Sequence, residues 1–337
     1  MKALVTGGGG FLGKKIVEML LARGDRVVVL GRSKYPEVEA MGAETVQLDI
    51  TKKEGLQDAC EGVDVVFHVA ALAGVWGPRE HYWNINVEGT RNMLEAAKAA
   101  GVKKFVQTSS PSAVWDGGDM AFVTEADCPY PNSFLTDYPE TKAISEQDAL
   151  KANCPEMSVT AIRPRLIWGP GDPHLIPRMI ERHSRLKIIG DGKNKVGICY
   201  VDNAAHAHIL ASDVLGPDSA NAGKAYFVAD DEPVEIWNWL NRFMERLGKK
   251  PITSKVPRNL AYGLGVVMEI VWRTLGIKGE PFMTRFVACS LSADYYYNLK
   301  NARADFGYHQ LVDPSEGFEK MVAYFTDQQS VAQESKD

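Results

Sequence analysis

The chain has 337 residues, enough to bury a sizeable core and to form one large α/β domain or two lobes. Apolar residues make up 45% of it and charged residues 24%, the ordinary mixture of a globular protein. The net charge of −5 leaves no broad basic surface, so nucleic acid is not an expected partner. The 5 cysteines are scattered and form no Cys-x-x-Cys pair, so we expect reduced thiols in a cytoplasmic protein, without a disulfide framework or a metal site.

The first half of the chain alternates short apolar runs with helical patterns. Strands are predicted at residues 2–7, 26–31, 44–49, 64–70, 103–110 and 158–164. Amphipathic helices are predicted between them, at residues 14–24, 55–62, 86–101 and 139–154. This alternation predicts parallel strands joined by crossover helices. The expected fold class is α/β, with a doubly wound parallel sheet of the Rossmann type over residues 1–165.

A glycine-rich turn follows the first strand and opens the first helix. Gly7, Gly10 and Gly13 match the pattern Gly-x-x-Gly-x-x-Gly, with Phe11 and Leu12 between the last two glycines. In such a turn one glycine makes the bend, one lets the backbone approach a pyrophosphate, and one lets helix and strand pack closely. The helix N-terminus then presents unpaired N–H groups to the phosphates. We therefore predict a dinucleotide-binding turn.

The same glycines nearly match a second phosphate-binding motif, Gly-x-x-x-x-Gly-Lys-[Ser/Thr], between Gly8 and Lys15. In that motif the last residue supplies a hydroxyl that holds Mg²⁺. Lys15 stands at this position, and an ammonium group cannot ligate the cation. A nucleoside triphosphatase is therefore disfavoured.

The end of the second strand bears on the choice of cofactor. An acidic residue there binds a ribose 2′-OH and selects NAD. Here the strand ends in Gly31 and is followed by Arg32, Ser33 and Lys34, which offer cationic and hydroxyl donors for a 2′-phosphate. We therefore predict NADP(H), the alternative being that Arg32 and Lys34 are solvated loop charges. Asp49, at the end of the third strand, is placed to meet the adenine amino group.

Beyond Pro164 the regular alternation is lost. We expect residues 166–195 and 213–326 to form a smaller, irregular carboxyl-terminal substrate lobe, and residues 196–212 to return to the Rossmann domain. Residues 327–337 form the one polar tail that we expect to be disordered. His206 and His208 point to different sides of a helix, and a metal pair needs a spacing of four, so we expect packing roles. The tryptophans at 237 and 239 are expected in the core.

The segment "YPETK" holds Tyr138 and Lys142, a spacing that also occurs by chance. It is one of a series of segments that, in order along the chain, resemble the extended short-chain dehydrogenase/reductases: "TGGGGFLG", "LDI", "HVAA", "NVEGT", "TSS", "YPETK", "IRPRLIWGPGD" and "VDNAAHAHI". Within that family, "YPETKAISEQ" and "VDNAAHAHIL" are similar to the 3β-hydroxysteroid dehydrogenase branch.

This resemblance implies an NAD(P)-dependent oxidoreductase with Ser110, Tyr138 and Lys142 as catalytic residues. The tyrosine exchanges a proton with the substrate oxygen, the serine donates a hydrogen bond to that oxygen, and the lysine also binds the nicotinamide ribose. We expect Lys142 and the helix N-terminus to lower the Tyr138 pKa from its usual value of about 10. Pro111 departs from the family pattern, which makes Ser112 an alternative to Ser110.

The resemblance also extends the cofactor site. It implies that Ile50, Ala70, Ala71 and Pro164 contact NADP(H), with NAD(H) as the alternative cofactor. Asn86 is expected to brace the fourth helix against its strand, and His68 to be structural.

The substrate follows from resemblance within the branch, to bacterial members that reduce 2-alkyl-3-oxoalkanoates. It implies reduction of the 3-oxo group of a hydrophobic β-keto acid. The alternatives are a 3β-hydroxysteroid or sterol 4-carboxylate dehydrogenase, a nucleotide-sugar epimerase or dehydratase, and a non-catalytic NADP sensor. The apolar residues 260–277 suit either a long hydrocarbon or a core, and Arg165 and Lys193 are open candidates for a carboxylate contact. The family implies a homodimer, while a multienzyme complex and contact with a membrane surface stay open.

Overall fold

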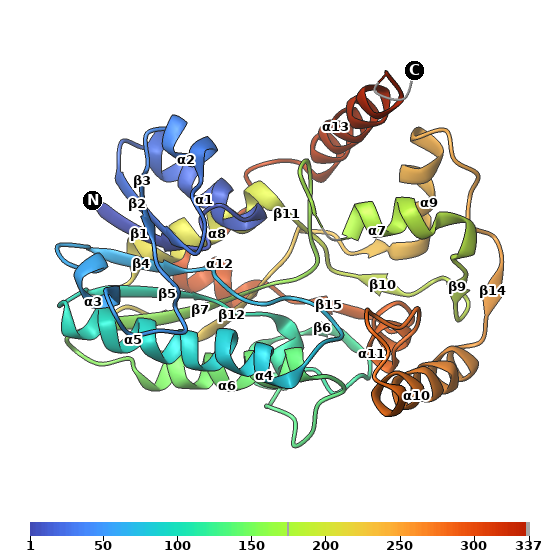
Figure 1. The fold of residues 1–337 in the computed structure, drawn as a ribbon, viewed down its shortest axis with the longest axis horizontal. Coiled ribbons are helices and arrows are strands. Elements are labelled where there is room, and N and C mark those ends of the chain that lie inside the picture. The colour runs from blue at the N-terminus through green and yellow to red at the C-terminus, as the bar shows by residue number, and fades with distance from the viewer. Residues whose placement is uncertain (174, 335–337) are drawn as a thin grey trace.

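The apolar runs of the first half assemble into one parallel sheet (Figure 1). The computed structural model describes residues 1–173 and 175–334. In that part of the chain the sheet has seven strands in the order β3-β2-β1-β4-β5-β7-β12, and neighbouring strands are parallel. The strands are β1 (Lys2–Thr6), β2 (Arg26–Gly31), β3 (Glu44–Gln47), β4 (Val65–His68), β5 (Lys104–Thr108), β7 (Ser158–Pro164) and β12 (Ala225–Val228). The strand order reverses between β1 and β4, where such sheets bind ligands. The predicted α/β Rossmann fold is confirmed.

Both faces of the sheet are covered because successive strand residues point to opposite sides. In β1, Ala3 and Val5 pack with α1 and α8, whereas Leu4 packs with α3, α5 and α6. Figure 1 shows these two helical layers on opposite sides of the sheet. The helices of this part are α1 (Phe11–Ala22), α2 (Pro36–Ala40), α3 (Leu56–Ala59), α4 (Arg79–Tyr82), the π-helix η1 (Trp83–Glu88), α5 (Gly89–Ala99), α6 (Asp137–Lys151), α8 (Val201–Val214) and α12 (Lys300–Phe306).

The seventh strand corrects one assignment made from the sequence. Strand β12 lies within residues 213–326, which we placed in the substrate lobe, but it pairs with β7 along the edge of the large sheet. The parallel pairing of β12 completes the hydrogen bonds of β7, whose residues are all buried. The chain therefore returns to the sheet a second time after α8, which itself packs against α1.

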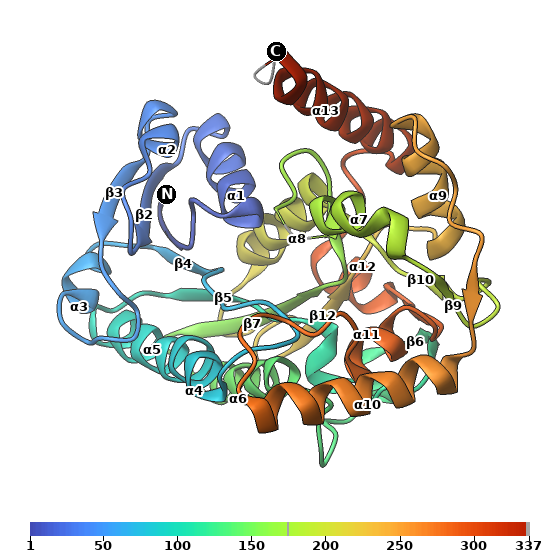
Figure 2. The ribbon, with the colours of Figure 1, turned by 45° about the vertical axis from the view of Figure 1, so that its right-hand side comes forward.

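The remaining elements form a smaller lobe on the other side of the molecule (Figure 2). Its main sheet has the order β13-β10-β15-β6, and two short strand pairs accompany it. The strands are β6 (Met120–Val123), β8 (Ile167–Trp168), β9 (Ile188–Ile189), β10 (Lys195–Val196), β11 (Cys199–Tyr200), β13 (Val234–Glu235), β14 (Lys255–Val256) and β15 (Tyr295–Tyr297). The longer helices are α7 (Leu175–Arg182), α9 (Ile236–Arg246), α10 (Arg258–Leu275), α11 (Arg285–Ser290) and α13 (Pro314–Glu334), and the 3₁₀ turns are η2 (Pro111–Val114), η3 (Glu125–Asp127) and η4 (His183–Arg185).

Aromatic side chains fill the core of this lobe. Trp168, Trp237 and Phe243 are buried there, and Trp239 packs against them. The core position expected for the two tryptophans of α9 is confirmed. Helix α10 behaves differently, because several of its apolar side chains, among them Leu264 and Val267, are exposed.

The polar tail is helical where the structure describes it. Phe318, Met321, Val322 and Phe325 recur at helical spacing and are buried in the lobe core, which fixes α13 along its first half. The polar residues 327–334 continue that helix, so the expected disorder is wrong for them, and residues 335–337 lie outside the described part. Within the described residues, no helix combines the length and apolarity needed to cross a membrane.

Candidate active site

The glycine turn is a tight cradle at the carboxyl end of β1. Gly7 has φ +68°, a left-handed conformation that side chains disfavour. A Cβ on Gly13 would lie 2.3 Å from the Gly7 carbonyl oxygen, so only glycine lets α1 approach the turn this closely. No side chain of the described residues caps α1 at Gly10, and its first turn carries no acidic residue. The free N–H groups and the helix dipole fit a pyrophosphate.

A cleft of about 680 Å³ starts at this turn and crosses the carboxyl ends of the strands to Tyr138. It brings together most of the residues that the sequence analysis assigned to the cofactor: Gly7, Gly10, Phe11, Leu12, Gly13, Arg32, Asp49, Ile50, Ala70, Ala71 and Pro164. Ser33 is exposed and is not among the described residues that line the cleft. The cleft is long and open at the strand-order reversal, which suits an extended dinucleotide.

At the far end of the cleft, Tyr35 lies over the glycine turn and the end of β2. A Cβ on Gly9 would be 2.1 Å from Tyr35 Cδ1, and a Cβ on Gly31 would be 2.3 Å from its hydroxyl oxygen. Nearby, the Thr51 N–H and hydroxyl donate to the Asp49 carboxylate at 3.0 and 2.9 Å and help lower its pKa. Asp49 therefore faces the cleft as a charged acceptor.

Helix α6 places the tyrosine and the lysine. Tyr138 lies in its first turn, next to Pro139, and Lys142 follows one turn later on the same face. Lys142 does not line the cleft but lies beneath it: its side chain is 2% exposed, and Nζ donates to the Thr108 carbonyl at 2.6 Å. Burial lowers the Lys142 pKa to about 8.

Ser110 joins this pair from the end of β5. It precedes the 3₁₀ turn η2, and its hydroxyl accepts a hydrogen bond from the Ser112 N–H at 3.2 Å. Pro111 occupies the first position of that turn, where its fixed φ is favourable, so the departure from the family pattern is accommodated locally. Ser110 is the less buried of the two serines, and its side chain acts on the Tyr138 phenol to lower its pKa. The geometry favours Ser110 over Ser112 as donor to a substrate oxygen.

The Tyr138 pKa corrects a second expectation. Burial raises it, and the opposing effects of the Ser110 side chain and the Arg165 charge are smaller. The expected lowering by Lys142 and the helix N-terminus is therefore wrong in this structure, because desolvation of the phenolate outweighs the favourable charges. A protonated phenol is the state that a proton donor needs.

An ion pair anchors α6 to the sheet behind these residues. Arg163 of β7 donates from Nε and Nη2 to the two carboxylate oxygens of Glu146 at 2.8 and 2.6 Å, and Glu146 is fully buried. The Tyr130 hydroxyl donates to the same carboxylate at 2.6 Å. This bidentate pair fixes the rotation of α6, and with it the direction of Tyr138 and Lys142.

Asn86 provides a second brace. It lies in the π-helix η1, a local irregularity common at functional sites. Its side chain accepts from the Leu72 N–H at 2.7 Å and donates to the Thr141 hydroxyl at 3.1 Å, so it ties the loop after β4 to α6. The bracing role expected for Asn86 is confirmed. His68 is fully buried and bonds Thr6 and Thr90 through its two ring nitrogens, in keeping with a structural role.

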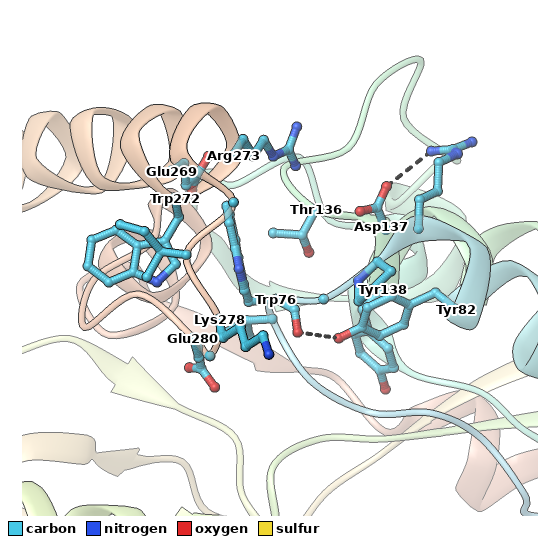
Figure 3. Close-up of a pocket in the computed structure, with 17 residues that line it drawn as sticks. Trp76, Tyr82, Thr136, Asp137, Tyr138, Glu269, Trp272, Arg273, Lys278 and Glu280 are labelled. Carbon is cyan, nitrogen blue, oxygen red and sulfur yellow. Dashed lines mark hydrogen bonds and ion pairs between the residues drawn. The ribbon is translucent and has the colours of Figure 1, made fainter.

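A second cavity, of about 650 Å³, meets the cleft at Tyr138 (Figure 3). Residues of α4, α6 and α10 and of the loops beside them form its walls. Trp76, Tyr82, Trp272 and Ile277 give these walls an apolar part, and Glu269, Arg273, Lys278 and Glu280 a charged part. The Tyr82 hydroxyl donates to the Trp76 carbonyl at 3.2 Å, and its ring meets Tyr138 edge-on. Tyr138 is thus shared by two cavities of different character.

Known proteins resemble this chain over most of its length. The model of the 3-beta hydroxysteroid dehydrogenase/isomerase family matches residues 4–258. The chain belongs to this family. A 2-alkyl-3-oxoalkanoate reductase of Shewanella oneidensis is 43% identical over 95% of this chain and 85% of its own length. The sterol-4-alpha-carboxylate 3-dehydrogenase (decarboxylating) of Homo sapiens is 35% identical, covering 96% and 88%.

Among solved structures, MoeE5 in complex with UDP-glucose and NAD matches 98% of this chain and 100% of its own, with a TM-score of 0.75 and 24% identity. This likeness shows the fold alone. With the family match, the chain is an NAD(P)-dependent oxidoreductase of the extended short-chain dehydrogenase/reductase type.

Several residues of this family member's site carried no local signal in the sequence. Tyr35 and Trp76 reach the cavities from loops, Tyr82 from the short helix α4 and Phe286 from α11 of the smaller lobe, and none of them is part of a motif. Of the two open candidates for a carboxylate contact, Arg165 lines the cleft, whereas Lys193 is exposed and does not. His208 is buried and bonded to Ala204 and Thr108, which confirms its packing role.

Proposed function

We propose that this enzyme reduces the 3-oxo group of a 2-alkyl-3-oxoalkanoate, a hydrophobic β-keto acid, with NADPH. The observation that carries the proposal is the position of Tyr138 where the glycine-turn cleft meets the partly apolar second cavity. One cavity suits a dinucleotide and the other an alkyl chain, so the phenol stands where a nicotinamide and a ketone would come together. The name of the relative from Shewanella oneidensis supports the same substrate.

The residues divide the reaction between them. A nicotinamide held in the glycine-turn cleft would supply the hydride that the ketone carbon accepts. As the carbon–oxygen π bond breaks, Tyr138 gives its phenolic proton to the oxygen, and Ser110 donates a hydrogen bond to the same atom. The phenolate that remains is stabilised by Ser110 and by the charge of Arg165, which act against burial, and Lys142 lies one helical turn away. The raised Tyr138 pKa keeps the phenol protonated until that transfer.

The choice of NADPH rests on the end of β2. The strand ends in Gly31, where an NAD enzyme carries an acidic residue; the Tyr35 ring packs against this glycine, and the exposed Arg32 beside it lines the cleft. A guanidinium there can hold a 2′-phosphate through charge-assisted hydrogen bonds.

Four expectations from the sequence stay predictions: the homodimer, the multienzyme complex, the membrane-surface contact and the cytoplasmic location.

A sterol remains the second candidate. The human relative is a sterol-4-alpha-carboxylate 3-dehydrogenase, and aromatic side chains in the walls of the second cavity could pack against the rings of a sterol. The decisive experiment compares purified enzyme on three compounds: a 2-alkyl-3-hydroxy acid with NADP⁺, a 3β-hydroxysteroid with NADP⁺, and UDP-glucose with NAD⁺. We expect the highest kcat/KM on the hydroxy acid. Higher activity on the steroid would transfer the assignment to the second candidate, and activity on the sugar nucleotide alone would contradict both.

A further inference from the structure

Arg165 is a buried cation at the catalytic end of the cleft. It follows Pro164 directly after β7, it is 9% exposed, and it lines the cleft together with Ser110 and Tyr138. Its guanidinium carbon lies 3.9 Å from the centre of the Tyr295 ring, and Nη2 reaches the Ser290 hydroxyl at 3.4 Å. The ring and the serine hold the guanidinium in place without neutralising its charge.

The charge of Arg165 is not balanced by a carboxylate. Among the residues that the structure describes, no acidic side chain forms an ion pair with it, and its buried Nε has no hydrogen-bond partner. Arg163, two residues earlier in β7, has its charge balanced, because it donates two hydrogen bonds to the buried Glu146 carboxylate. A buried cation without an anion is costly, whereas its planar fork of donors matches a carboxylate that arrives with a ligand.

We propose that Arg165 binds the substrate's carboxylate and so makes the enzyme select β-keto acids over their esters. This rests on the proposed function. In a β-keto acid the carboxylate carbon is two bonds from the ketone carbon, so one cation beside the proton donor can reach it. The two side chains are close enough for the positive charge of Arg165 to lower the Tyr138 pKa, against the larger effect of burial. Arg165 therefore orients the ketone oxygen toward Tyr138 by holding the acid group.

The test compares Arg165→Gln with wild-type enzyme in the oxidation direction, where the substrates are stable. The probes are a 2-alkyl-3-hydroxy acid and its methyl ester, each with NADP⁺, and NADPH affinity is measured in parallel by fluorescence. We expect kcat/KM for the acid to fall about 100-fold, mainly through KM, as on removing one partner of a buried charge pair. The values for the ester and for NADPH binding should stay within about threefold. Arg165→Lys should recover only part of the loss, since an ammonium group lacks the bidentate fork. Lys193→Gln is the matched control, because that cation is exposed and outside the cleft.

Three results would overturn the assignment. Equal losses on acid and ester would show a packing role, and a loss of NADPH affinity would make Arg165 a cofactor ligand; both leave the proposed function standing. Wild-type enzyme that oxidises neither compound would overturn the proposed function, and this assignment with it.

Discussion

Burial of Lys142 makes the free energy of unfolding of this enzyme depend on pH. Replacing this one lysine removes that contribution and so measures it. Its pKa falls from 10.5 to about 8 in the folded protein because desolvation disfavours the cation. Below pH 8 the lysine is charged in both states, so the folded protein carries the full cost. Between pH 8 and 10.5 the folded state loses the proton while the unfolded chain keeps it, so the free energy of unfolding rises with pH. Since a tenfold change in the acid dissociation constant corresponds to about 1.4 kcal/mol, the whole effect is about 3 kcal/mol.

Lys142→Met removes this titration. We expect the unfolding free energy of wild-type enzyme, relative to the variant, to rise by about 2.5 kcal/mol between pH 7 and pH 10. Loss of the hydrogen bond to Thr108 adds a difference that does not depend on pH. Urea unfolding under reducing conditions at several pH values measures the effect. Lys98→Met, at an exposed position of α5, should give a flat difference. A flat or falling difference for Lys142→Met would refute the reasoning.

Three further substitutions test the parts of the site separately. Gly13→Ala places a Cβ 2.3 Å from the Gly7 carbonyl oxygen. It should weaken NADPH binding about tenfold or more and lower the free energy of unfolding by about 1–3 kcal/mol. Gly263→Ala is the control, because a Cβ at that position of α10 meets open space. Arg32→Asp should weaken NADPH binding by about 10- to 100-fold and leave NADH affinity nearly unchanged, and an unchanged NADPH affinity would contradict the cofactor assignment. Glu146→Gln leaves the buried Arg163 without its anion, so the free energy of unfolding measured by urea denaturation should fall by about 3–5 kcal/mol. A loss below about 1 kcal/mol would show that the ion pair does not anchor α6.

The sequence predicts those parts of the fold that local pattern determines. The first six strands of the sheet are continuous β-branched runs between amphipathic helices, and each is found close to its expected position. Strand β12 has an equally apolar sequence, but its place in the sheet depends on a long excursion through the smaller lobe. Proximity along the chain gives no sign of such a return.

The site also has a part that local sequence determines and a part that depends on the packing of distant segments. Residues within contiguous motifs, such as the glycine turn, Ser110 and Tyr138, are found at the cleft because the local conformation of each motif places them there. The second cavity is not, because Trp76 and Trp272 come from segments that only the packed lobes bring together. The Tyr138 pKa belongs to the same class: helix position and nearby lysine are visible in the sequence, whereas the burial that outweighs them is a property of the assembled fold.

The central claim is that Tyr138 donates the proton, and Tyr138→Phe tests it most directly. The variant keeps the ring and its edge-on contact with Tyr82 and removes only the hydroxyl. In single-turnover measurements of NADPH oxidation by a 2-alkyl-3-oxo acid, we expect the rate to fall by about 10²- to 10⁴-fold with NADPH affinity unchanged. Tyr324→Phe, which loses an exposed phenol on α13 away from both cavities, should keep wild-type turnover. A Tyr138→Phe rate within tenfold of wild type would contradict the account.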